Sequence, residues 1–81
     1  MTKTIFQLEV GDHILSPYFH GEMKRCKVYE QIRPSRKVVN VNGKDQLHES
    51  IGFIKASIDD LEGKMIYTEY GLDSERKFEL I

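Results

Sequence analysis

The feature that most restricts the fold of this chain is a series of short segments in which apolar and polar residues alternate. A period of two is typical of a β-strand with one face on a core and the other in water. In the first segment, the alternation places Phe6, Leu8 and Val10 on the buried face. We read strands over Thr4–Val10, His13–Ser16, Arg25–Arg33, Lys37–Val41, Lys44–His48, Lys64–Tyr70 and Lys77–Ile81.

Residue pairs with strong turn preferences separate these segments. Gly11-Asp12 divides the first two, and Pro17 ends the second because a proline cannot donate a hydrogen bond to a neighbouring strand. Asn42-Gly43 tolerates the positive φ angles of a type I′ turn. This pair predicts a two-residue hairpin between Lys37–Val41 and Lys44–His48.

The stretch Ser50–Glu62 is compatible with two structures. One is a helix of about three turns that ends at Gly63 as its C-terminal cap. It would make the protein α+β, an antiparallel sheet with one helix at Ser50–Glu62. The apolar residues at helical spacing are Ile51, Ile54, Ile58 and Leu61.

Two features argue against this helix. The acidic residues of 59–62 would crowd its negative end, and Gly52 would lie in its first turn. If the chain instead stays extended through Ala56, Ser57 becomes the N-cap of a single short helical turn. The acids then fall at the favourable end of that turn. We favour this second structure.

Short strands at close spacing, with one helical turn before the last of them, suit a small closed or half-closed barrel. The turn Leu8-Glu9-Val10-Gly11-Asp12-His13-Ile14 resembles the start of SH3-like barrels, including the KOW and Tudor-type modules. The resemblance implies a five- to six-stranded SH3-like barrel or half-barrel that binds nucleic acid or peptides. The chain lacks a Tudor aromatic cage and a well-formed KOW signature, so no functional residue is carried over from either.

The length of 81 residues predicts a single domain over 1–81, since a second core would leave each half too small. Such a small core leaves a role for partner binding or homo-oligomerisation in stability. No segment approaches the roughly 18 apolar residues needed to cross a bilayer, and the polar Met1–Val10 is unlike a secretory signal. We therefore expect a cytoplasmic protein with no membrane partner.

The charges are unevenly distributed, although the net charge is −1. Residues 24–44 carry seven basic side chains and one acidic one, whereas nine acids and four bases follow from Asp45 onward. Such a basic hairpin could follow a phosphate backbone. Alternatively, these residues form a solvated face and partly pair with the acids. The candidate nucleic-acid contacts are Lys24, Arg25, Lys27, Arg33, Arg36, Lys37 and Lys44.

Aromatic residues stand in the loop that follows Pro17. Tyr18 and Phe19 are candidate anchors for a protein partner, since buried aromatic rings dominate the energy of many interfaces. Tyr29, in the next strand segment, is a third candidate. The alternative is that the loop folds back and covers one open end of the barrel.

Nothing in the sequence predicts catalysis, a cofactor or a metal site. Asp59 and Asp60 are adjacent, so their side chains diverge instead of sharing an acid–base site. Cys26, at an alternating position, reads as a small buried hydrophobe. The sequence spacings of the candidate soft metal ligands match no compact zinc-binding pattern. These ligands are His13, His20, Cys26 and His48.

The sequence therefore predicts a small cytosolic protein-interaction module and not an enzyme. Its compact, charge-segregated form resembles accessory proteins encoded by bacteriophages, which implies a regulator or inhibitor that docks on a host protein. The alternative is a nucleic-acid-binding SH3-like barrel that uses the basic region 24–44.

Overall fold

The computed structural model describes residues 1–81 and shows a mainly β protein, which confirms the predicted fold class. Neither of its two 3₁₀ helices has the length to cross a membrane. The elements in chain order are β1 (Thr2–Thr4), η1 (Ile5–Gln7), β2 (His13–Pro17), η2 (Phe19–Gly21), β3 (Met23–Ile32), β4 (Ser35–Val41), β5 (Lys44–Ser50), β6 (Gly52–Ile58), β7 (Met65–Tyr70) and β8 (Lys77–Leu80).

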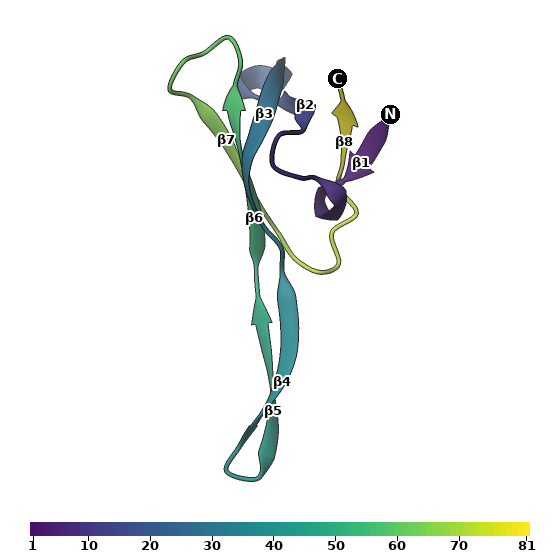
Figure 1. The fold of residues 1–81 in the computed structure, drawn as a ribbon, viewed down its shortest axis with the longest axis vertical. Helices are drawn as coiled ribbons and strands as arrows, with labels where there is room; N and C mark the ends of the chain where they lie inside the picture. Colours follow the sequence, from purple (N-terminus) through teal and green to yellow (C-terminus); the bar gives the residue numbers. More distant parts are fainter.

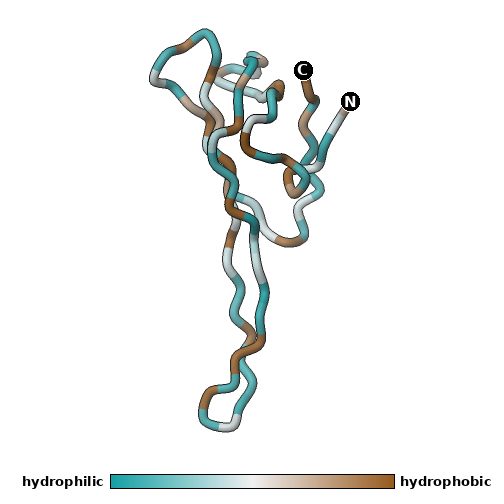
Figure 2. The backbone as a smooth tube through the Cα atoms, in the orientation of Figure 1, coloured by the Kyte–Doolittle hydropathy of each residue, from teal (hydrophilic) through white to brown (hydrophobic).

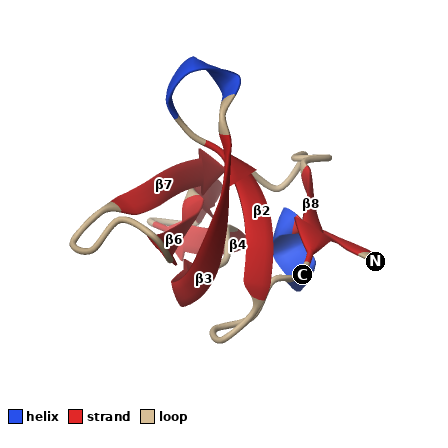
Figure 3. Cartoon of the chain, turned by 90° about the horizontal axis from the view of Figure 1, so that it is seen from above, coloured by secondary structure: helices blue, strands red, loops and turns tan.

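Six strands form one antiparallel sheet in the order β1-β8-β2-β3-β6-β7. The strands β2, β3, β6 and β7 lie side by side in the sheet, with the β4–β5 hairpin inserted between β3 and β6 in the chain, and β8 returns to pair with β2. Seen from above, the sheet curls around its interior (Figure 3). No backbone pairing joins β1 to β7, so the sheet is half-closed and β7 is one of its edges.

The interior is filled by residues that alternate with exposed ones along the strands. In β3, Cys26 and Val28 are buried, and Lys27 between them is exposed. Cys26 is thus a core residue, as predicted. Burial raises the pKa of the Cys26 thiol, which disfavours the reactive thiolate.

The first segment departs from the predicted strand. β1 ends at Thr4, and the single turn η1 follows. The tighter period of this turn buries Ile5 and Leu8, whereas Val10 is 64% exposed. The strand predicted over Thr4–Val10, with Val10 on its buried face, is therefore wrong.

Two side chains explain why this segment leaves the sheet. The amide nitrogen of Gln31 donates to the carbonyls of Ile5, at 2.9 Å, and Leu8, at 3.0 Å. Arg33 also donates to the Leu8 carbonyl, at 3.0 Å. The Gln31 amide oxygen in turn accepts the hydroxyl of Tyr70 at 2.8 Å. Side chains thus satisfy carbonyls that a strand would have paired with a neighbouring backbone.

The predicted turn at Gly11-Asp12 is present, and Gly11 adopts a positive φ of 100°. The Asp12 carboxylate accepts the backbone N–H of Glu9 at 2.9 Å and the ammonium of Lys3 at 3.0 Å. The Glu9 N–H, aided by Lys3, lowers the pKa of Asp12. The ionised carboxylate therefore stabilises this turn.

The stretch Ser50–Glu62 forms no helix. Strand β6 runs through Ile58, pairing with β3 on one side and β7 on the other, and turns lead from there to Gly63. The α+β alternative is therefore wrong, and the favoured extended structure continues past Ala56. Ser57 lies within β6 and caps no helical turn. Pairing on both sides outweighs the helical spacing, because alternate residues of β6 fill the core.

The β4–β5 hairpin projects from the curled sheet as an arm (Figure 1). Asn42 and Gly43 have positive φ angles of 53° and 79°, which confirms the predicted hairpin turn. The register of β3 with β6 shifts by one residue between Val28 and Glu30, and the pairing of Ser35 with Ser50 continues the register that follows this shift. Apolar and polar residues both occur along the arm, where nearly every side chain is exposed (Figure 2).

Candidate binding groove beside strand β7

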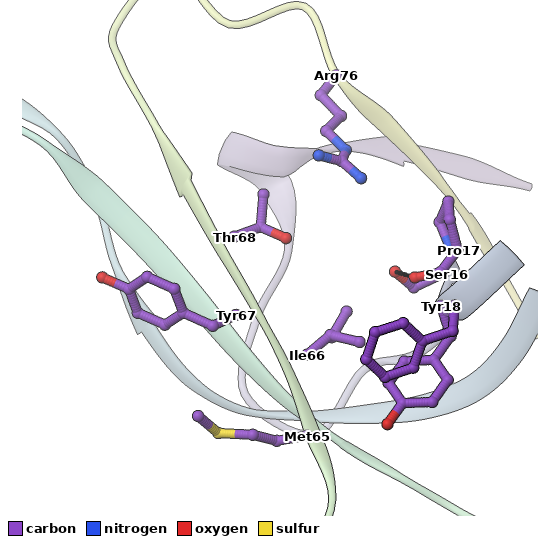
Figure 4. Close-up of a pocket in the computed structure, with 9 residues that line it drawn as sticks. Ser16, Pro17, Tyr18, Met65, Ile66, Tyr67, Thr68 and Arg76 are labelled. Carbon is purple, nitrogen blue, oxygen red and sulfur yellow. Dashed lines mark hydrogen bonds between the residues drawn. The ribbon is translucent and has the colours of Figure 1, made fainter. Parts of the chain in front are cut away.

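An open groove of about 380 Å³ lies between strand β7 and the end of β2 with the loop that follows it. Figure 4 shows its lining. The volume is near the lower limit of ligand cavities, so it suits one or two side chains better than a large cofactor. The lining residues are Ser16, Pro17, Tyr18, Phe19, Met65, Ile66, Tyr67, Thr68 and Arg76.

Strand β7 supplies one wall. The side chains of Ile66 and Thr68 point into the groove, whereas the Tyr67 ring points away from it (Figure 4). Tyr67 therefore lines the groove mainly through its backbone. This alternation follows from the pleat of the strand, which sends successive side chains to opposite faces.

The second wall consists of two aromatic rings. Tyr18 and Phe19 pack edge to face, with their centroids 4.6 Å apart. Tyr18 is half-buried against the core, whereas Phe19 is 68% exposed. The loop is held by the backbone N–H of Tyr18, which donates to the Glu22 carbonyl at 2.7 Å. The loop thus packs Tyr18 against the core and leaves Phe19 exposed to solvent.

Arg76 lies at one end of the groove, with its guanidinium directed toward the space beside Thr68 (Figure 4). The guanidinium carbon is 5.2 Å from the centre of the Phe78 ring, and the Arg76 carbonyl accepts the N–H of Ile5 at 2.9 Å. No ion pair of the structure includes Arg76. Its fork of donors is free to bind a carboxylate or a phosphate.

Tyr29 lies on the outer face of β3, beside this groove and not in it. Its hydroxyl donates to the sulfur of Met65 at 2.7 Å, across the intervening strand β6. Of the three predicted aromatic residues, Tyr18 and Phe19 therefore line the groove, whereas Tyr29 only contacts one of its lining residues, Met65. Thr68 and Arg76 were missed by the sequence reading, because only the sheet order places them beside Tyr18.

The seven predicted nucleic-acid contacts do not gather on one face. Lys24 binds Asp60 and Glu22, each at 3.1 Å, and these bonds raise the pKa of Lys24. Arg33 binds backbone carbonyls, and Arg36 pairs with Glu49 at 2.8 Å. The other four are exposed at two separate places: Arg25 and Lys27 on β3, and Lys37 and Lys44 on the arm.

Comparison of the chain with protein-family models, with curated proteins and with solved structures found no match. No three His, Cys, Asp or Glu side chains lie close enough together to hold a metal ion.

Proposed function

We propose that the protein is a small cytosolic protein-interaction module that binds a segment of its partner in the groove beside β7. The observation that carries the proposal is the convergence of Phe19, the edge of β7 and the unpaired Arg76 around one open space. Aromatic and arginine side chains are the residues that most often dominate interface energies. A groove of this composition favours recognition over catalysis.

The arrangement of charge favours a protein partner over nucleic acid. A phosphate backbone is bound by several cations on a continuous surface, whereas three of the seven predicted cations here are held by other groups of the protein. That this chain regulates or inhibits a host protein stays a prediction. So does its relationship to SH3-like barrels, which the meander of β2, β3, β6 and β7 with the returning β8 supports.

One observation keeps nucleic acid as the second candidate. On the arm, Lys37, Lys44 and His48 share one face, whereas both carboxylates of the arm lie on the other. A two-stranded ribbon of this kind fits the major groove of a duplex. Binding to duplex DNA should then weaken linearly with salt on a log-log plot, and a flat titration at about 50 mM salt would exclude it.

The experiment for the leading proposal compares Phe19→Ala with Leu47→Ala. Each variant is used to capture partner proteins by affinity, and crosslinking shows whether a captured protein contacts the groove. Both side chains are more than half exposed, so both variants should keep wild-type stability within about 0.5 kcal/mol. Phe19→Ala should abolish capture, and Leu47→Ala, on the arm, should leave it unchanged. Equal capture by both variants would remove the groove from consideration.

A further inference from the structure

The backbone of β7 has a set of hydrogen-bonding groups that no strand uses. The N–H of Ile58 donates to the carbonyl of Lys64 at 3.0 Å, which makes these residues a hydrogen-bonded antiparallel pair. Such pairs alternate along a ladder, and β6 and β7 stay in register through to Tyr70. The even-numbered residues of β7 therefore bond to β6. Met65, Tyr67 and Glu69 direct their N–H and C=O groups to the free edge.

This edge lacks three of the usual devices that prevent further pairing. Proteins commonly protect edge strands with a proline, a bulge or a covering segment. Strand β7 contains no proline, and its pairing with β6 shows no register shift. None of the backbone hydrogen bonds from turns or loops reaches Met65, Tyr67 or Glu69. The edge is therefore ready to pair with another strand.

The free edge and the groove are the same place, since Met65 to Thr68 line the groove along that edge. We propose that the occupant is an extended segment of a partner protein, which adds to β7 as a further strand and places an acidic side chain on Arg76. This rests on the proposed function of the groove. Main-chain hydrogen bonds then supply affinity, and alternate side chains supply specificity.

The residues that line the two walls of the groove determine which side chains of the partner segment it can bind. Residues of the added strand that point inward lie over Ile66 and Thr68, where the small volume favours one or two compact apolar side chains. An acidic residue at the Arg76 end finds an unpaired guanidinium. Glu69 does not repel it, because the Glu69 carboxylate accepts the hydroxyl of Tyr67 on the outer face, at 3.0 Å.

A second copy of this chain is a poorer occupant. The edge of β7 faces a wall that includes Phe19 and Arg76 of the same chain. A second β7 edge would bring its own Phe19 and Arg76 with it, and a groove of about 380 Å³ offers little room for them. A single extended segment has no such obstacle. Self-association through β7, detected by sedimentation, would overturn the choice of a partner segment.

The test selects binders from a displayed library of random peptides of about eight residues, slightly longer than a typical strand. The selection uses the full chain, and affinities are then measured by fluorescence anisotropy. We expect selected peptides to alternate apolar and polar residues and to contain an acid. N-methylation at successive positions should weaken binding roughly tenfold or more at every second residue, because only alternate N–H groups face β7.

Variants of the chain provide the matched measurement. Tyr67→Pro removes a free N–H while leaving the ladder to β6 intact, as edge strands tolerate. It should bind selected peptides roughly tenfold more weakly than Tyr67→Ala, which keeps that N–H. Circular dichroism verifies that both variants fold. Equal affinities of the two variants would overturn strand addition.

The outcomes separate the two proposals. If Phe19→Ala and Arg76→Gln weaken binding but N-methylation has no period of two, the groove binds and strand addition is wrong. If neither substitution changes the affinity, the proposed function is wrong as well. A library that yields no binder on the wild-type chain also overturns strand addition.

Discussion

Replacing Gln31 by methionine tests how the fold holds its first turn. Methionine keeps the approximate shape of glutamine but removes the two donors to Ile5 and Leu8 and the acceptor for Tyr70. The Leu8 carbonyl retains its bond from Arg33, whereas the Ile5 carbonyl loses its side-chain donor.

The expected cost is about 2–3 kcal/mol of the free energy of unfolding. A net hydrogen bond contributes roughly 1 kcal/mol, and a polar group left unpaired in a partly buried site costs roughly 1–3 kcal/mol. For a domain of this size the total free energy of unfolding is about 4–12 kcal/mol, so the loss is a large fraction of it.

Urea unfolding measures this loss through far-UV circular dichroism, since the chain has no tryptophan. With a denaturant dependence of about 1 kcal/mol per molar, the midpoint should fall by roughly 2–3 M. Tyr70→Phe is the matched control, because it removes only the bond to Gln31 and should cost about 1 kcal/mol. A Gln31→Met variant within about 0.5 kcal/mol of wild type would refute the assigned role.

Three further predictions concern the Asp12 turn, the arm and Gly52. Hydrogen bonding lowers the pKa of Asp12, so the stabilisation by its carboxylate is present above the ordinary aspartate pKa of 3.8 and is lost as pH falls through the lowered folded-state pKa. The stability difference between wild type and Asp12→Asn in urea should therefore be full at neutral pH and shrink as the pH is lowered below 3.8. Replacing Val38–Leu47 by Asn-Gly shortens the arm to a hairpin with a turn of the same length. Because nearly every side chain of the arm is exposed, the thermal midpoint should stay within about 5 °C of wild type, and a larger fall would show that the arm supports the sheet. Gly52→Ala places a methyl group against Pro34 and should cost about 1–3 kcal/mol, whereas Gly71→Ala, with open space around it, should be nearly neutral in the same thermal melts.

Alternation predicted most of the sheet because strands with one buried face carry a clear signal. The prediction of a hairpin at Asn42-Gly43 is confirmed for a local reason, since its turn needs the positive φ angles that these residues tolerate. The turn at Ile5–Gln7 was missed because its partners, Gln31 and Arg33, are distant in sequence. Long-range hydrogen bonds of this kind leave no local pattern.

The groove was predictable only in part. Tyr18 and Phe19 stand out as aromatic residues in a loop, and this local oddity identified one wall. The other wall depends on β7 being an edge strand, which the chain order of segments does not reveal. Arg76 follows a turn and looks like any exposed cation until the fold places it beside Thr68 without an acidic partner.

Amide hydrogen exchange of the free protein, resolved by residue with NMR, tests the free edge of β7 most directly. The amides of Met65, Tyr67 and Glu69 should exchange almost as fast as those of an unstructured peptide. The even-numbered amides of the same strand, which bond to β6, should be slower by roughly a hundredfold or more. Equal protection of both sets would contradict the account, because it would mean that the edge is already paired.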